Sequence, residues 1–309
     1  MPIRSILVAD DIENRTATGK QRSQAISKIA SSLAQRLKSG IDLMFVEDLT
    51  TYPAGKLGSF RFLEWHSQHQ ERLEEISRQF IVPVSCFVKS GSPAEQILKV
   101  VRSRSAPELV VMGTQGRKGL KRLLIGSVAE EVIRHSKRPV MVIGPLAQEL
   151  NRDLPGQKQL KILVPTDLGR NSRAAEEYAL SLAKRIRARV TLYHCLWDNI
   201  NAIIVNSAYS GMAPYNLDAI IDESRGEAVE IMKRKTDFFQ KHGVPGDYKV
   251  EEKSITSQCA VYQECESGYS LVVMGTHGRN ALLNAFFGST ARETILNAPV
   301  PVITVHSGK

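Results

Sequence analysis

The sequence predicts an α/β protein with two similar halves, each a parallel, doubly wound sheet with helices on both faces. Short runs rich in Val, Ile and Leu alternate with longer helix-like patterns along the 309 residues, and this alternation is typical of parallel sheets. The short runs are apolar almost throughout, as expected for strands that helices cover on both sides. The order of segments and one glycine pattern occur twice, which indicates an internal repeat.

Each half is expected to follow the pattern β-α-β-α-β-α-β-α-β. The first-half strands are expected near residues 4–9, 41–47, 82–89, 108–113 and 139–144, and the helices near 20–38, 59–80, 93–104 and 127–136. The second-half strands are expected near 160–166, 189–195, 248–254, 270–275 and 300–306, and the helices near 171–187, 216–242, 256–267 and 289–297.

The repeat divides the chain into two domains. Residues 6–11 match residues 162–167 at an offset of 156, and the glycine patterns match at an offset of 162. We therefore expect a first domain over 1–147, a linker over 148–159 and a second domain over 160–309. The linker is polar and carries turn-forming residues.

The composition excludes several classes of protein. No apolar run is long enough for a transmembrane helix, and the N-terminal apolar stretch is too short for a signal peptide, so we expect a cytoplasmic protein without membrane contact. The net charge is +9, but basic and acidic residues alternate along the helices, which argues against nucleic-acid binding. The four cysteines have no C-x-x-C spacing, so metal or thioredoxin-like chemistry is not expected.

The duplicated glycine pattern is the main functional signal. It reads G-x2-G-x9-G-S and covers 113–127 and 275–289. Each copy starts at the end of an apolar strand and ends where a helix begins. Glycines allow backbone to approach a ligand closely, and a helix start offers unpaired N–H groups to an anion. The pattern predicts a phosphate-binding loop, although the glycines could also serve only to make tight turns.

An aspartate follows the first strand of each half, at Asp11 and Asp167. In doubly wound sheets, ligands bind beyond the carboxyl ends of the strands, where the strand order reverses. If the first and fourth strands flank that point, the aspartate faces the glycine loop. A carboxylate there can accept a hydrogen bond from a base amine or a ribose hydroxyl, which suits a nucleotide. Each aspartate could instead cap the following helix or turn.

On these motifs the chain resembles the universal stress protein family in its tandem two-domain form, over essentially its whole length. In that family G-x2-G-x9-G-[ST] marks the ATP-binding members. The resemblance implies two Rossmann-like five-stranded sheets of order 3-2-1-4-5. It also implies a stress-response sensor or regulator that binds ATP, AMP or ADP, with Mg²⁺ held through the phosphates and at most slow ATP hydrolysis. The last strand of each half, near 139–144 and 300–306, would pair the halves into an intramolecular pseudo-dimer. Whether two chains also form a homodimer is left open.

The resemblance also assigns the site residue by residue. Asp11 and Asp167 would contact adenine, and the following residues would line its pocket or hold ribose and phosphates: Val46, Met112, Gly113, Gly116, Gly126, Ser127 and Val128 in the first half, and Cys195, Met274, Gly275, Gly278, Gly288, Ser289 and Thr290 in the second. Arg117 adds a cation to the first loop.

The chain departs from the family pattern in three places. Residues 254–257 of the second half lack the G-x-P turn that the first half has at 91–93. Asp10 precedes Asp11, so two acids compete for the adenine contact, and we select Asp11 because it aligns with Asp167. The first glycine loop carries four cations, at 117, 118, 121 and 122, whereas the second carries only Arg279. We therefore expect the first site to be the better supported of the two.

Other functions fit the sequence less well. It has no G-x4-G-K-[ST] loop, which would aim a lysine at the outer phosphates, and no S-G-G-x-D-S motif of the adenylating enzymes that resemble the PP-loop family. We expect no catalytic residue and no protein metal ligand. The remaining alternative is a pseudo-dimeric scaffold or interaction protein that binds no nucleotide.

Overall fold

The computed structural model of the chain describes most of its residues. The described residues are 5–49, 59–103, 105–114, 124–150, 154, 159–197, 200–201, 203–205, 217–252, 256–276 and 287–306. Gly116, Arg117 and Gly278 of the expected site, and the middle of both glycine loops, lie outside them.

The first half contains five strands and five helices among its described residues. In chain order these are β1 (Ile6–Ala9), α1 (Ala17–Leu37), β2 (Ile41–Glu47), α2 (Ser59–Ser77), β3 (Val84–Ser90), α3 (Pro93–Val101), β4 (Leu109–Gly113), α4 (Ser127–His135), β5 (Val140–Ile143) and α5 (Pro145–Leu150).

The second half repeats this order. It contains β6 (Lys161–Pro165), α6 (Arg170–Ile186), β7 (Arg189–Cys195), α8 (Leu217–Lys241), β8 (Gly246–Glu251), α9 (Ser257–Cys265), β9 (Leu271–Gly275), α10 (Ser289–Asn297) and β10 (Val302–Val305).

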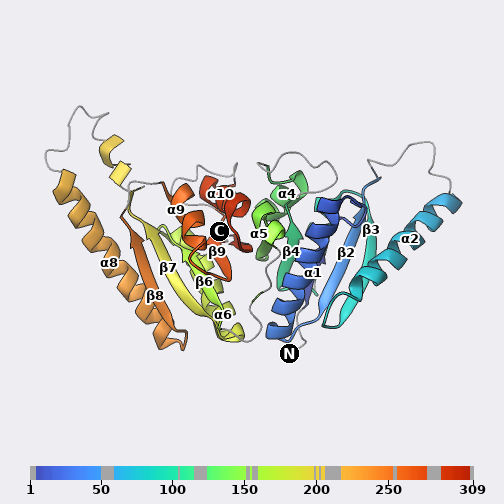
Figure 1. Ribbon diagram of the computed structural model, residues 1–309, viewed down its shortest axis with the longest axis horizontal. Coiled ribbons are helices and arrows are strands. Elements are labelled where there is room, and N and C mark those ends of the chain that lie inside the picture. Colours follow the sequence, from blue (N-terminus) through green and yellow to red (C-terminus); the bar gives the residue numbers. More distant parts are fainter. Residues whose placement is uncertain are drawn as a thin grey trace.

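All ten strands belong to one sheet, in the order β3-β2-β1-β4-β5-β10-β9-β6-β7-β8. Within each half the strands are parallel and follow the order 3-2-1-4-5, so the predicted fold class is confirmed. The halves meet where β5 and β10 pair antiparallel, with Met141 opposite Ile303. Figure 1 shows the two half-sheets side by side, and β5 and β10 stand at the centre of the sheet order.

The two halves also share their strand register. Ile6 lies opposite Ile41 on β2 and Leu109 on β4. Its repeat partner Ile162 lies opposite Val190 on β7 and Leu271 on β9. The equal registers make Val46 equivalent to Cys195 and Met112 equivalent to Met274, as the sequence alignment has them.

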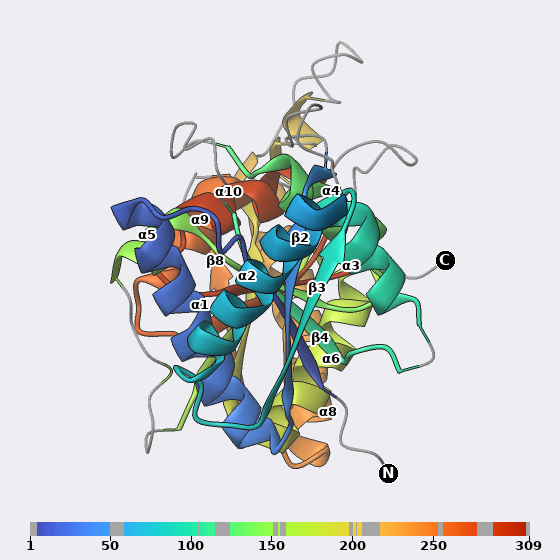
Figure 2. The ribbon, with the colours of Figure 1, turned by 90° about the vertical axis from the view of Figure 1, so that its right-hand side faces the viewer.

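Helices cover both faces of the sheet, as Figures 1 and 2 show. Helices α1, α2, α6 and α8 pack on one face, over a core that includes Val8, Val111 and Val273. Helices α3, α4, α9 and α10 pack on the other face, over a core that includes Met112 and Met274. Each core contains residues of both halves, so burial of apolar area stabilises their association. None of the described helices is long and apolar enough to cross a membrane.

Two contacts outside the sheet also join the halves. Arg185 of α6 donates to the Glu108 carboxylate through both terminal nitrogens, at 2.7 and 3.0 Å. This hydrogen bonding raises the pKa of Arg185, so the guanidinium stays charged. At the end of β5, Gly144 lies against α10 so closely that a Cβ there would be 1.8 Å from the Ile295 carbonyl oxygen. Only glycine fits at this position.

Several elements differ from the expected bounds by two or three residues; β8, for example, ends at Glu251 rather than near 254. Two differences from the expected elements have a clear physical reason. Helix α5 (Pro145–Leu150) occupies the end of the expected first domain and the start of the expected linker; a proline at the first helical position favours such a start. Helix α1 starts at Ala17 rather than near 20, because the Thr16 hydroxyl caps it by accepting the Gly19 N–H at 3.1 Å.

Candidate functional site

The glycine loops start and end beside each other at the carboxyl ends of β4 and β9. The Gly126 N–H donates to the Thr114 carbonyl at 2.7 Å, and the Gly288 N–H donates to the Thr276 carbonyl at 2.9 Å. These two bonds place the starts of α4 and α10 directly at the strand ends. Both loops therefore have the strand-to-helix geometry that the glycine pattern predicts.

Glycine at the helix start has two consequences. A Cβ at Gly126 would lie 2.6 Å from the Thr114 carbonyl oxygen, so the turn itself requires glycine. Gly126 and Gly288 are also the N-cap residues of α4 and α10 and give neither helix a side-chain cap. The first N–H groups of each helix can therefore donate to an anion or to water. The turn-making role and the phosphate-binding role are compatible at this position.

The apolar residues expected around adenine lie at the matching strand ends. Val46 and Met112 are 7% and 4% exposed, and their equivalents Cys195 and Met274 are 6% and 4% exposed. All four belong to the core on the α3/α4 and α9/α10 face of the sheet. Packing accounts for their burial, and this core ends next to the glycine loops.

In the first half an arginine from α1 organises the end of β1. Arg22 Nε lies 3.0 Å from Asp10 Oδ1, and both side chains are almost fully buried. The same guanidinium donates to the Asp11 carbonyl oxygen at 2.6 Å, while Asp11 Oδ1 accepts the Glu13 N–H at 3.2 Å. Asp10 is therefore paired within the fold, which favours Asp11 as the acid that faces a ligand.

Arg22 also explains the first glycine of the pattern. A Cβ at Gly113 would lie 2.8 Å from Arg22 Cδ, so the arginine stem covers this glycine on the α1 face. Arg22 was not expected at the site from the sequence, because a cation on a helix usually lies on the solvated face. The only sequence signal was the adjacent pair Asp10 and Asp11, because a buried carboxylate needs a nearby positive charge.

In the second half, the buried carboxylate belongs to a helix, and the polar side chain that binds it follows the first strand of that half. Thr166 replaces Asp10, and its hydroxyl donates to Glu176 Oε1 at 2.7 Å. Lys235 reaches the other oxygen of Glu176 from α8, at 2.6 Å. The acid now comes from the helix, and the cation comes from a different helix. Neither Glu176 nor Lys235 was expected from the sequence, since residues 10 and 69 positions from Thr166 carry no local signal of this contact.

Asp167 has the most informative environment of the expected site residues. Its Oδ1 accepts the Gly169 N–H at 2.8 Å and the hydroxyl of Ser172. Its Oδ2 is buried and has no hydrogen-bond partner among the residues that the structure describes. Buried polar atoms in proteins are nearly always hydrogen-bonded. The loop thus fixes one carboxylate oxygen and leaves the other for a donor such as an amine or a hydroxyl.

The hydroxyl residues at the two helix starts differ. In the second half, Gln258 donates to Ser289 Oγ at 2.9 Å, and the Ser257 and Thr290 hydroxyls lie 3.1 Å apart. Helix α9 therefore holds the start of α10 through side chains. In the first half, Ser127 is exposed and Val128 is half-buried at the start of α4.

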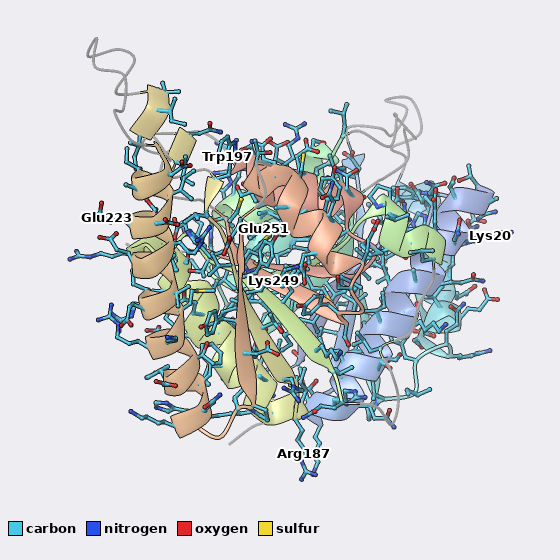
Figure 3. The ribbon with its side chains drawn as sticks, turned by 60° about the vertical axis from the view of Figure 1, so that its left-hand side comes forward. Lys20, Arg187, Trp197, Glu223, Lys249 and Glu251 are labelled. Atoms are coloured by element: carbon cyan, nitrogen blue, oxygen red, sulfur yellow. The ribbon has the colours of Figure 1, made fainter. Side chains whose placement is uncertain are left out.

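A polar network lies beside Cys195 in the second half. The Tyr193 hydroxyl donates to Glu251 at 3.3 Å, and Lys249 bonds to Glu264 of α9; Figure 3 shows Lys249 and Glu251 on β8. Burial raises the pKa of Tyr193 well above its usual range, so the phenol stays a donor. This network ties β7, β8 and α9 together under the strand end.

No metal centre is evident in the described part of the chain, where no three His, Cys, Asp or Glu side chains are placed to hold an ion. The fold and the strand-end loops define a tandem, doubly wound α/β protein with a glycine-rich turn from strand to helix in each half. The sequence profile described as the universal stress protein family matches residues 2–144 and again 160–306. The chain belongs to the universal stress protein family, with one family domain in each half.

Individual relatives agree with this assignment. A universal stress protein of Methanocaldococcus jannaschii is 30% identical over 133 residues, which cover 40% of this chain and 76% of that protein. One of Mycobacterium tuberculosis is 26% identical over 250 residues, covering 74% and 77% of the two chains. The crystal structure of a universal stress protein from Archaeoglobus fulgidus superposes with a TM-score of 0.69 at 18% identity and covers both chains completely. That last likeness shows the shared fold.

Proposed function

We propose that the chain binds an adenine nucleotide, ATP in the first instance, at the strand ends of each half and acts as a cytoplasmic sensor or regulator in the stress response. The observation that carries this proposal is the buried Oδ2 of Asp167, which has no partner among the described residues. A carboxylate held in this way suits the exocyclic amine of adenine. The uncapped start of α10, at Gly288, offers N–H groups for the phosphates.

The first half supports the same proposal through its backbone. The Gly126–Thr114 bond brings the uncapped start of α4 to the end of β4. Arg22 holds the Asp11 carbonyl and so fixes the loop that carries the expected adenine contact. The strongest single observation thus lies in the second half, for which the sequence gives the weaker support.

The proposed role is binding rather than catalysis. Phosphoryl transfer depends on positioned metal ions and charges around the transferred group. The described residues offer N–H donors and a carboxylate, and Mg²⁺ would arrive with the phosphates. We therefore propose at most slow ATP hydrolysis, with the bound nucleotide serving as the signal.

The test compares matched variants of the two halves by calorimetric titration. Protein that has been unfolded, freed of small molecules and refolded should bind two ATP molecules per chain. Asp167→Asn should weaken one site by about 10- to 100-fold, because a hydrogen bond to a charged group is lost, and Asp11→Asn should weaken the other. GTP should bind more weakly to both, because its base presents a carbonyl where adenine has the amine.

Mass spectrometry of small molecules released from the purified protein identifies the natural nucleotide. If no nucleotide is released and stripped protein gives no heat with ATP, the nucleotide proposal fails and the pseudo-dimeric scaffold remains. If ATP binds but both aspartate variants bind it equally well, the assigned adenine contact is wrong.

A further inference from the structure

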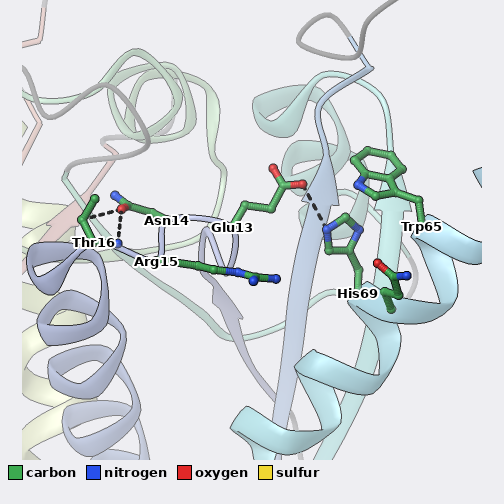
Figure 4. Close-up of a pocket in the computed structure, with 7 residues that line it drawn as sticks. Glu13, Asn14, Arg15, Thr16, Trp65 and His69 are labelled. Carbon is green, nitrogen blue, oxygen red and sulfur yellow. Dashed lines mark hydrogen bonds and ion pairs between the residues drawn. The ribbon is translucent and has the colours of Figure 1, made fainter. Parts of the chain in front are cut away.

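A cavity of about 550 Å³ lies between the loop that follows β1 and the second and third turns of α2. Its lining residues are Glu13, Asn14, Arg15, Thr16, Trp65, Gln68 and His69, and Figure 4 shows them around the space. The volume is in the usual range for small-molecule sites. Helix α2 packs on the α1 face of the sheet, whereas Val46 and Met112, which are expected to line the adenine pocket, lie on the α3/α4 face. The cavity therefore lies on the other side of the sheet from these two residues, and it shares with the candidate nucleotide site the loop that carries Asp11.

The base of the cavity is held by a buried charge network. His69 Nδ1 lies 3.0 Å from Glu47 Oε1, and its Nε2 lies 3.0 Å from Glu13 Oε1. Glu47 is completely buried and also accepts from Ser90 Oγ at 2.7 Å. His69 thus bridges Glu13 and Glu47 and ties the loop to the sheet.

Two further residues give the cavity its binding character. The Trp65 indole packs edge-on against His69, with ring centroids 4.7 Å apart, and this contact holds the indole in place. Arg15 is exposed, and no ion pair or hydrogen bond joins it to the described residues. Figure 4 shows its side chain extending from the loop toward α2. Since His69 holds the Glu13 carboxylate and no described acidic side chain pairs with Arg15, Arg15 is the charged group of the lining that can pair with a ligand.

We propose that this cavity binds a small planar aromatic anion, such as an aromatic carboxylate. The ring packs against the Trp65 indole, where offset or edge-on contact between aromatic rings is favourable. The carboxylate pairs with the Arg15 guanidinium, whose planar fork matches it with two hydrogen bonds. The amides of Asn14 and Gln68 provide further polar contacts at the rim. An aromatic cation lacks the pairing with Arg15 and is repelled by it.

Trp65 provides the readout, because the chain has only two tryptophans. In a Trp197→Phe background, Trp65 fluorescence is followed during titration with benzoate, benzamidine and cyclohexanecarboxylate. Benzoate should produce a saturable change with a dissociation constant of about 1 mM, as expected for a ligand of so few atoms. Benzamidine should produce none, and cyclohexanecarboxylate should bind several-fold more weakly, because its ring is not planar.

Arg15→Gln should weaken benzoate binding about tenfold. The matched control is Arg170→Gln, since Arg170 is an exposed arginine at the start of α6 in the other half, and this variant should bind benzoate normally. Calorimetry of Trp65→Leu should show the loss of benzoate binding without relying on fluorescence.

The proposal is overturned if benzoate gives no saturable change, if benzamidine binds equally well, or if Arg15→Gln binds benzoate normally. Competition between ATP and benzoate would also overturn it, because the cavity would then be part of a nucleotide site. Asp167→Asn should leave benzoate binding unchanged, so failure of the nucleotide proposal and failure of this one are distinguishable.

Discussion

Replacement of Gly144 by alanine tests how the two halves fit together. The new methyl carbon would lie 1.8 Å from the Ile295 carbonyl oxygen and 3.0 Å from its carbonyl carbon. A carbon and a carbonyl oxygen in contact are separated by about 3.3 Å, so β5 and α10 must move apart by about 1.5 Å. Both segments are backbone in packed elements, and rotation of a side chain cannot relieve the clash. We expect a loss of about 3 kcal/mol, at the upper end for overpacking.

Equilibrium unfolding in urea measures this loss, and Gly226→Ala is the matched control. Gly226 lies inside α8, and a Cβ there meets no atom within 4 Å. Alanine should stabilise the helix by about 0.5–1 kcal/mol. The same substitution should therefore shift the unfolding midpoint down at Gly144 and up at Gly226. A Gly144→Ala midpoint equal to or above that of the unmodified protein would refute the close packing of the halves.

Three other expectations concern buried polar groups. Arg22→Met leaves the buried Asp10 carboxylate without its cation and should lower the free energy of unfolding by about 3 kcal/mol. Adding Asp10→Asn to this variant should restore part of the loss. A loss under about 1 kcal/mol for Arg22→Met contradicts the buried ion pair. Burial raises the pKa of Cys265 to about 12, so iodoacetamide at pH 8 should modify this thiol only after the protein unfolds. Mass spectrometry measures the modification, and rapid modification of Cys265 in folded protein contradicts its burial. Burial also raises the pKa of Tyr269 to about 12 from its usual 10. The folded state thus holds this proton more tightly, and stability that is fully present below pH 10 should decline as the pH rises toward 12. Urea midpoints across this range measure the decline, and Tyr269→Phe should make it less steep.

The sheet could be predicted from the sequence because its strands are buried on both faces. Strands β2 and β7 have the expected limits, 41–47 and 189–195, since each is mainly apolar and is buried along most of its length. Helix α5 was not predicted, because its six residues are too few to show a helical period.

The candidate site could be predicted only in part. The glycine spacing locates the loops, and repeat alignment selects Asp11 and Asp167. The partners that shape these loops come from distant helices: Arg22 binds Asp10, and Lys235 binds Glu176. A charged residue on a helix usually faces solvent, so no local pattern distinguishes these side chains. The unpartnered oxygen of Asp167 depends on atomic positions that residue identity does not determine.

The antiparallel pairing of β5 with β10 has a geometric consequence for the two loops. In a flat sheet it would direct the strand ends of the two halves toward opposite edges. Five steps separate β1 from β6 in the sheet order, and a twist of about 20–25° per step turns one half by about 100–125° relative to the other. The two strand directions then diverge by only about 55–80°, and Figure 1 shows α4 and α10 on the same side of the molecule. Coiling of one continuous sheet thus places the starts of α4 and α10, where the two glycine loops end, on one side of the molecule.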